Sequence, residues 1–460
     1  MSSVKIISPI DGAVLAERPL IADAALNAAI SRARAAQGDW ARVPTAERVA
    51  RTIAMLDALV AMYDEIVPEL ARQMGRPVRY GGEKSGLEER ARYMAGIAEE
   101  SLAPLLPKET WGFRRYVKRE PVGIVLVIAP WNYPFLTAGN TIFPALMAGN
   151  AVILKHAAQT LLVGERFQQA ADKAGLPKGL FQNLVLSHQQ TEKLIGSGTV
   201  DHINFTGSVE GGKAIERAAA GTFASLGLEL GGKDPAYVLP DAKLDHAIEN
   251  LVDGAFFNSG QCCCGIERIY VHEDVFEPFL EGFVDLTKKY VVGNPLDEAT
   301  TLGPMARGNF ADHVRGHTEE ALRKGARTHI RMKVANDAKG SPYIAPEVLT
   351  NVNHQMAVMR EETFGPVVGI MKVRDDEEAI QLMNDSPYGL TASIWTTDME
   401  RAAEIGDRVE TGTIFMNRCD YVDPGLVWTG VKDTGRGAAL SKYGFDALTR
   451  PKSFHLREVR

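Results

Sequence analysis

The feature that most constrains the fold is an alternation of short apolar runs with helical stretches that begins at Val122. The runs are apolar enough to be buried parallel strands, and they cover residues 124–128, 151–154 and 202–205. A helical pattern at 161–174 lies between the last two. Alternating strands and helices predict a doubly wound α/β sheet, which binds ligands at the carboxyl ends of its strands.

A second region of alternation starts at Pro235, with helices expected at 244–257 and 275–291. Residues 22–102 are mainly helical by their pattern and carry no candidate chemistry. A chain of 460 residues is too long for one simple core, so we expect two or three domains. The 45% hydrophobic and 24% charged shares are typical of a soluble globular protein.

Charge and hydropathy exclude two classes of partner. The net charge is -7, charges of both signs are interspersed, and there is no basic tract, so we expect no nucleic-acid partner. The most apolar region, 122–154, is broken by asparagines and prolines, which predicts buried core and no membrane span. The first residues lack an apolar segment of signal-peptide length, and four cysteines without a pairing pattern favour a reducing compartment. We therefore expect a cytoplasmic protein.

Two segments have the alternation of strands outside the main sheets. Residues 111–120 alternate aromatic and basic residues, and 449–460 have a similar pattern near the end of the chain. Residues 111–120 are either an ordinary surface hairpin or an edge covered by a partner, because an exposed pairing edge is a liability. We expect 449–460 to pair with them. The polar segment 335–341 predicts a surface loop.

The stretch Phe257–Gly265 holds three of the four cysteines in a row: Cys262, Cys263 and Cys264. A thiol is a useful nucleophile only as thiolate, and the small residues around these thiols would admit a planar substrate. The alternative is three inert buried residues, since free cysteine is often buried. We expect no metal site, because adjacent cysteines should not all point at one ion and CxxC spacing is absent.

A glycine-rich loop at 207–212 follows the strand pattern 203–205 and precedes a helix expected near Gly212. Such a loop brings backbone N–H groups and a helix N-terminus to a pyrophosphate, although the spacing also fits a plain tight turn. Lys155 ends another strand and is either a solvated charge or a ligand of a ribose hydroxyl or phosphate. Asn132, Lys155 and Gly207 should all lie at the carboxyl ends of strands.

These stretches occur in one order with further motifs at 130–134, 205–208, 228–233, 361–366 and 384–390. The set resembles the signature of the aldehyde dehydrogenase superfamily over nearly the whole chain. The resemblance implies a Rossmann-like cofactor domain, an α/β catalytic domain and a small β oligomerisation arm that joins a neighbouring subunit. The expected bounds are 1–102 and 122–230, then 231–435, then 103–121 with 436–460, in a homodimer or homotetramer.

The resemblance also assigns catalytic roles. Cys263 matches the Gly-Gln-x-Cys pattern and would attack an aldehyde carbonyl. The Asn132 amide would stabilise the oxyanion, and Glu229 would activate the water that clears the thioester. Together they imply oxidation of an aldehyde to its acid with NAD or NADP. A catalytically silent relative and a coenzyme A-dependent, acyl-transferring enzyme are the alternatives, and the presence of Glu229 argues against the second.

The cofactor residues implied by the resemblance include Glu362 and Phe364, whose alternatives are a solvated cap and core packing. The full set is Trp131, Lys155, Ala158, Gly207, Ser208, Gly212, Glu362 and Phe364. Ala158 departs from the family pattern, since many NAD-preferring members have a glutamate there. Without that carboxylate, repulsion of a 2′-phosphate falls by ~1–4 kcal/mol, which predicts that NADP is tolerated or preferred. A charged His156 would add to this preference.

Substrate choice in the family comes from residues near the nucleophile and from the loop after Asn417. The expected substrate residues are Tyr133, Cys262, Cys264, Arg418, Tyr421 and Trp428. Aromatic residues there fit a medium-sized aldehyde. Arg418 would suit an acidic one such as succinic semialdehyde, unless the neighbouring Asp420 and Asp423 neutralise it. Variants around Lys155 and Ser208 also resemble those of some shorter semialdehyde dehydrogenases.

Overall fold

The apolar runs lie in a six-stranded sheet with the strand order β18-β8-β7-β4-β5-β6. The computed structural model describes residues 3–335 and 338–459. All neighbours in this sheet are parallel except β18, which runs antiparallel to β8. The strands are β4 (Ile124–Ala129), β5 (Ala151–His156), β6 (Phe181–Asn183), β7 (His202–Thr206), β8 (Ser225–Glu229) and β18 (Gly435–Arg436).

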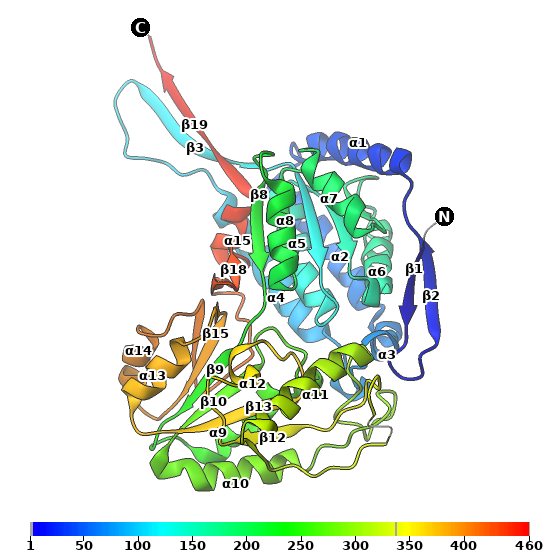
Figure 1. Ribbon diagram of the computed structural model, residues 1–460. Coiled ribbons are helices and arrows are strands. Elements are labelled where there is room, and N and C mark those ends of the chain that lie inside the picture. The colour runs from blue at the N-terminus through cyan, green and yellow to red at the C-terminus, as the bar shows by residue number, and fades with distance from the viewer. Residues whose placement is uncertain (1–2, 336–337, 460) are drawn as a thin grey trace.

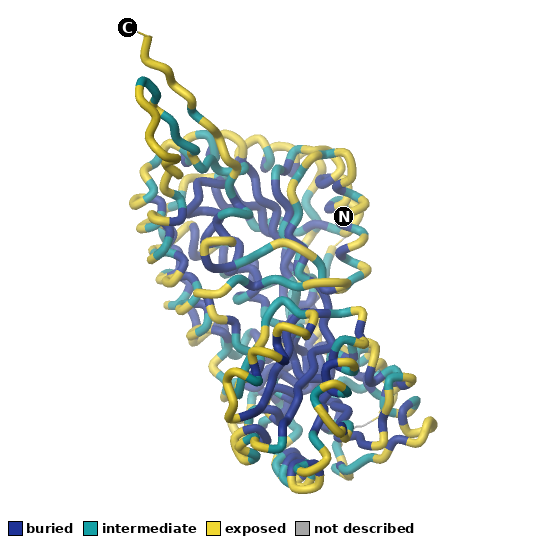
Figure 2. The backbone as a smooth tube through the Cα atoms, turned by 90° about the vertical axis from the view of Figure 1, so that its left-hand side faces the viewer, coloured by how far each residue is buried: buried dark blue, intermediate teal, exposed yellow. Residues whose placement is uncertain are grey.

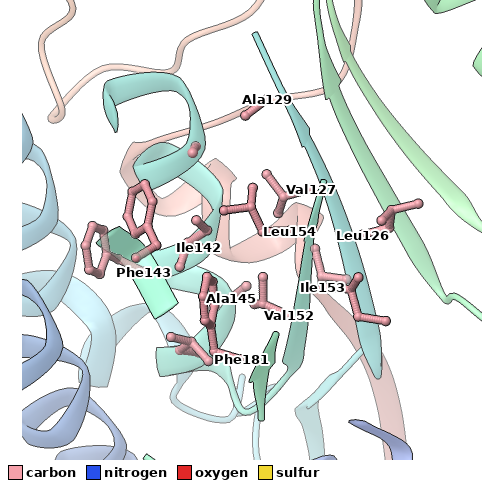
Figure 3. Close-up of a cluster of buried hydrophobic side chains, with 14 of the residues drawn as sticks. Leu126, Val127, Ala129, Ile142, Phe143, Ala145, Val152, Ile153, Leu154 and Phe181 are labelled. Carbon is pink, nitrogen blue, oxygen red and sulfur yellow. The ribbon is translucent and has the colours of Figure 1, made fainter. Parts of the chain in front are cut away.

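Eight helices pack around this sheet and bury it (Figure 1). Every residue of β4 is buried, which is why its sequence is continuously apolar. Figure 3 shows Val127 and Leu154 of the strands beside Ile142 of α5. The helices are α1 (Asp23–Trp40), α2 (Thr45–Val60), α3 (Tyr63–Met74), α4 (Lys84–Leu102), α5 (Pro134–Ala148), α6 (Leu161–Lys173), α7 (His188–Gly196) and α8 (Val209–Ala219).

A second, seven-stranded sheet has the order β11-β12-β13-β10-β9-β15-β16 and is parallel except for β11. Its side chains alternate between two cores, since Tyr237 packs in one cluster and Val238 in the other. The strands are β9 (Asp234–Val238), β10 (Ile266–His272), β11 (Arg327–Thr328), β12 (Glu347–Thr350), β13 (Val367–Val373), β15 (Thr391–Trp395) and β16 (Thr413–Met416). The helices are α9 (Leu244–Phe256), α10 (Phe276–Thr287), α11 (Gly308–Arg323), α12 (Ala357–Arg360), α13 (Asp376–Asn384) and α14 (Met399–Gly406).

A two-stranded ribbon projects from the part of the molecule that is built on the six-stranded sheet (Figure 1). It pairs β3 (Phe113–Pro121) with β19 (Thr449–Arg457) in antiparallel register along their whole length. Figure 2 shows that most of its outer part is exposed. The remaining elements are the pair β1 (Ser3–Ile7) and β2 (Val14–Pro19), the pair β14 (Tyr388–Gly389) and β17 (Val431–Lys432), and helix α15 (Ser441–Ala447).

Most expected elements are confirmed, with small differences at their ends. The strands expected at 124–128, 151–154 and 202–205 are β4, β5 and β7, and the two outer segments pair with each other. Helix α8 begins at Val209 rather than near Gly212, because the Ser208 hydroxyl caps it by accepting from the N–H of Gly211. Helix α10 ends at Thr287, earlier than expected.

Two further expectations concern loops and boundaries. Residues 336 and 337 of the predicted surface loop lie outside the described residues, and its other residues form turns and coil. The domain bounds stay a prediction. No helix within 3–335 or 338–459 is long and apolar enough to cross a membrane.

A buried ion pair joins the start of α5 to the loop after α3. Arg76 Nη1 lies 2.8 Å from Glu83 Oε1, and their side chains are only 2% and 1% exposed. The other Glu83 oxygen accepts the N–H groups of Phe135 at 3.0 Å and Leu136 at 2.7 Å, in the first turn of α5. The pair therefore fixes the chain that immediately follows Asn132.

We expect Glu83→Gln to destabilise the protein, because it leaves the buried Arg76 cation without a counter-charge. Breaking such a pair costs about 3–5 kcal/mol. The thermal unfolding midpoint should fall by several degrees. In contrast, Glu88→Gln removes a partly exposed partner of Arg92, worth about 0–1 kcal/mol, and is the matched control. Equal midpoints for the two variants would contradict this role of the buried pair.

Candidate active site

The turn that precedes the cysteines has an unusual backbone. Asn258, Ser259 and Gly260 have φ values of 53°, 57° and 68°, in the left-handed region that favours glycine. The Asn258 amide donates to the carbonyl oxygens of Asn132 at 3.3 Å and Gln261 at 3.1 Å. A Cβ at position 260 would overlap the Gly365 carbonyl oxygen. Contacts from several distant segments therefore hold this turn and aim the residues after it.

The three consecutive cysteines converge instead of diverging. Their Sγ atoms all lie within 4.8 Å of one another, and those of Cys262 and Cys264 are 3.5 Å apart. A tight turn, closed by the Gly265 N–H donating to the Cys262 carbonyl at 3.1 Å, produces this arrangement. The argument that adjacent cysteines cannot point at one place is therefore wrong here. Only Cys263 is partly exposed, and the other two are buried.

The three thiols exchange hydrogen bonds and titrate as a group. Bonds from Cys263 and Cys264 lower the pKa of Cys262. The bond with Cys262, together with burial and the Glu229 charge, raises the pKa of Cys263. The Cys263 thiol also donates to Glu229 Oε1 at 3.7 Å. The accessible thiol is thus protonated at neutral pH and has a carboxylate base beside it.

Glu229 ends strand β8, where parallel strands present side chains to ligands. Burial raises the pKa of this carboxyl, while hydrogen bonds from Trp428 and Cys263 oppose the rise. Glu229 and Trp428 also line a crevice of about 20 Å³ with Thr137 and Asn140, which is room for one water molecule. A carboxylate with a raised pKa next to such a space can act as a general base.

The largely apolar cavity at Cys263 has a volume of about 280 Å³. Residues from the parts built on the six-stranded and the seven-stranded sheet both line it. It is lined by Pro130, Trp131, Asn132, Thr206, Gly207, Ser208, Leu230, Gly231, Cys263, Phe310, His313, Glu362, Thr363 and Phe364. Seven of the residues singled out by sequence therefore meet here: Trp131, Asn132, Gly207, Ser208, Cys263, Glu362 and Phe364.

The walls of this cavity suit a flat ring next to a phosphate. Trp131 stacks on Phe310 with centroids 5.2 Å apart and meets Phe364 edge-on at 5.7 Å. Gly207 and Ser208 bring the N-terminus of α8 to the same cavity, which supplies N–H groups for an anion. This donor set fits a nicotinamide dinucleotide.

Hydrogen bonds from buried neighbours fix the segment 361–366, which carries Glu362 and Phe364. Buried Glu267 accepts the N–H groups of Thr363 and Phe364, each at 2.9 Å, and it pairs with buried Lys233. Glu362 Oε1 accepts the Gly232 N–H at 2.9 Å, and burial raises the pKa of Glu362 to about 7. This carboxyl is therefore half protonated near neutral pH.

Three proposed cofactor residues lie outside the cavity lining. Lys155 is the next-to-last residue of β5 and is partly buried, and burial lowers its pKa. Ala158 begins the short 3-10 turn before α6. A Cβ at Gly212 would lie 2.6 Å from Leu230 Cδ2, so this glycine lets α8 pack closely. His156 is buried against Pro134 with its pKa lowered to about 4 by burial, so the expectation that its charge helps a phosphate is wrong.

The proposed substrate residues Tyr133, Arg418 and Tyr421 lie in cation–ring stacks. Tyr133 lies under the Arg76 guanidinium, and a hydrogen bond from its side chain lowers the pKa of Cys262. Arg418 stacks on the Tyr421 ring at 3.4 Å. Burial raises the pKa of Asp420 to about 8, so this neighbour is largely protonated at neutral pH and does not neutralise Arg418.

Sequence reasoning missed several residues of the site. Phe310 and His313 line the cavity from helix α11, and Arg76 joins Asn132 to Asn258. Phe310 carries no signal beyond an aromatic residue at the start of a helix. Arg76 looks like any charged residue until its burial is known.

We expect Gly232→Ala to displace Cys263, because the added Cβ would overlap the Cys263 carbonyl oxygen. A small displacement of a reacting group can cost about 100-fold in turnover. Cofactor reduction by aldehydes, the activity implied by the motifs, measures the effect. Gly96→Ala, where a Cβ meets open space, is the control. Equal activity of the two variants would argue against this close approach.

Comparison with known proteins identifies the family. The aldehyde dehydrogenase family model matches residues 1–454. An aldehyde dehydrogenase of Paenarthrobacter nicotinovorans is 35% identical over 434 residues, covering 92% of this chain and 93% of that protein. A succinate-semialdehyde dehydrogenase (NADP+) of Mycobacterium avium (strain 104) is 33% identical over 451 residues, covering 97% and 95%.

Solved structures agree with the sequence relatives. The crystal structure of a succinate-semialdehyde dehydrogenase from Burkholderia pseudomallei has a TM-score of 0.94 and 30% identity, covering 99% of this chain and 95% of that one. The match includes both sheets and both sides of the Cys263 cavity, since it spans nearly the whole of each chain. This chain therefore belongs to the aldehyde dehydrogenase family and is an NAD(P)-dependent aldehyde dehydrogenase.

Proposed function

We propose that the enzyme oxidises an aldehyde to its carboxylic acid through a covalent thioester on Cys263 that water hydrolyses. The observation that carries this proposal is the contact of the Cys263 thiol with Glu229, 3.7 Å away, beside the cavity that Asn132 also lines. Nucleophile, base and oxyanion donor are thus neighbours. This is the arrangement that acyl chemistry requires.

The residues act in sequence. Glu229 takes the Cys263 proton, and the thiolate attacks the aldehyde carbon. The Asn132 side-chain amide and the Cys263 N–H stabilise the oxyanion, and one such donor is worth about 3–4 kcal/mol. Trp131 and Phe364 would hold NAD(P)+ beside Cys263, where the cofactor would supply the hydride acceptor that turns the Cys263 adduct into a thioester. Glu229 passes the thiol proton on to solvent and, once ionised again, removes a proton from water, which attacks the thioester and releases the acid and the free Cys263.

The base distinguishes this reaction from the alternatives. Hydrolysis needs a carboxylate with a raised pKa beside a water-sized space, and Glu229 has both. An acyl-transferring enzyme would use coenzyme A as the acceptor instead. A silent relative would lack the nucleophile or its base.

Other properties follow as parts of the same proposal. Among the described residues, strand β19 pairs with β3 alone, and we assign its other edge to a contact with a second copy in a homodimer or homotetramer. Four free thiols favour a reducing compartment such as the cytoplasm. The substrate is a medium-sized aldehyde or a semialdehyde, as in the Mycobacterium avium relative's name.

Cys263→Ser should abolish aldehyde oxidation and leave cofactor binding intact, because an alcohol beside this base is a poorer nucleophile. Glu229→Gln should give one burst of reduced cofactor and then stop, because the thioester is no longer hydrolysed. Stopped-flow absorbance without coenzyme A resolves both effects. Turnover near that of the wild type in either variant would remove the role assigned to that residue.

The cofactor preference is testable at Ala158. With no carboxylate there, we expect NADP to be used at least as well as NAD. Ala158→Glu should lower kcat/KM for NADP by about 10- to 1000-fold, since ~1–4 kcal/mol of repulsion returns. Ala158→Gln adds the same bulk without charge and is the control. A wild-type preference for NAD of more than about 100-fold would contradict this reading.

A further inference from the structure

The thiols of Cys262, Cys263 and Cys264 form a compact triangle. Their Sγ atoms all lie within 4.8 Å of one another, and those of Cys262 and Cys264 are 3.5 Å apart. Zinc binds thiolate sulfur at about 2.3 Å, so two sulfur atoms on one tetrahedral ion stand about 3.8 Å apart. The triangle therefore has the size of three corners of a zinc site.

The chemistry of the three side chains also suits such an ion. Within residues 3–335 and 338–459, this is the one group of three His, Cys, Asp or Glu side chains whose ligand atoms lie close enough to share an ion. Thiolate sulfur is a soft ligand that selects zinc and similar ions over magnesium and calcium, which prefer oxygen. Three protein ligands leave a fourth position for water, as in open zinc sites.

The backbone holds this triangle in place. The Gly265 N–H donates to the Cys262 carbonyl at 3.1 Å and closes the turn that carries the three residues. The preceding residues, 258–260, have left-handed backbone conformations and are fixed by contacts with distant segments. Ligands that are already in position bind an ion without the ordering that flexible ligands require.

Access and charge favour the same site. Cys263 is partly exposed and lines the cavity of about 280 Å³, from which an ion can reach the two buried thiols. Three thiolates with one Zn²⁺ carry one net negative charge, and a cation lies close by. Burial lowers the pKa of Arg90, while negative charge at Cys264 acts in the opposite direction. Glu229 Oε1, 3.7 Å from the Cys263 Sγ, can accept a hydrogen bond from water at the fourth position.

We propose that Cys262, Cys263 and Cys264 form an inhibitory binding site for one zinc-class ion. Binding forms three Zn–S bonds and displaces the thiol protons to solvent, with no change of oxidation state. The Cys263 sulfur is then held by the ion and does not attack a carbonyl. Cys262 and Cys264 do not line the cavity assigned to the cofactor, so that cavity stays open. Metal binding goes beyond the proposed function, and only its effect on turnover rests on it.

The first experiment measures coordination in the wild type. Reduced, metal-free, untagged protein in a thiol-free buffer is mixed with Zn²⁺, and bound metal is counted after dialysis. One ion per chain should bind, and X-ray absorption at the zinc edge should show three sulfur neighbours at about 2.3 Å and one oxygen at about 2.0–2.2 Å. Mg²⁺ should not displace it. Coordination by nitrogen and oxygen alone would overturn the proposal.

Substitutions then locate the site. Cys264→Ser and Cys262→Ser each remove one ligand and should weaken zinc binding by at least about 100-fold, since losing a residue that only supports a ligand already costs about 10- to 100-fold. Cys419→Ser makes the same change at a buried thiol outside the group and is the matched control, with wild-type affinity expected. Equal affinity in all four proteins would contradict the site. Where a variant does not fold, the absorption spectrum of the wild type decides.

The inhibitory effect can be read without a substrate. Iodoacetamide should alkylate Cys263 in the metal-free protein, as shown by mass spectrometry of the segment 257–265. One equivalent of Zn²⁺ should protect this thiol, a chelator should remove the protection, and NADP binding should persist throughout. Alkylation at the metal-free rate with zinc bound would overturn the inhibitory role. A wild type that binds zinc through three sulfurs but oxidises no aldehyde would support this site and contradict the proposed function.

Discussion

The buried Arg76–Glu83 ion pair is the interaction on which the rest of the site depends. Glu83 holds the first turn of α5, while Arg76 donates to the Asn132 carbonyl and to the Asn258 side chain. One pair thus links the proposed oxyanion donor to the left-handed turn that aims the cysteines. A buried pair of this kind adds little net stability. Its value here is the register between two segments 126 residues apart.

Several ionisable side chains of the site are buried away from water. Burial raises the pKa values of the carboxyls of Glu229, Glu362 and Asp420, to about 7 for Glu362 and to about 8 for Asp420. Groups poised between protonation states suit proton transfer at neutral pH.

The α/β fold and the main residues of the site could be predicted from the sequence, for physical reasons. Buried parallel strands leave continuous apolar runs such as 124–128, so the α/β architecture is predictable, and the ordered motifs bring Asn132, Glu229 and Cys263 to notice. Side-chain burial is not visible in a residue type, which is why the charge expected on His156 is wrong and why Arg76 passes unnoticed. The three thiols converge because of one backbone turn, which no sequence pattern predicts.

The central claim is that Cys263, rather than either neighbouring thiol, carries the acyl group during turnover. Rapid acid quenching in the first turnover, followed by peptide mass spectrometry of the segment 257–265, tests this directly. The account predicts one acyl group, located on Cys263, that appears with reduced cofactor and then decays. An acyl group on Cys262 or Cys264, or reduced cofactor formed with no acylated peptide, would contradict it.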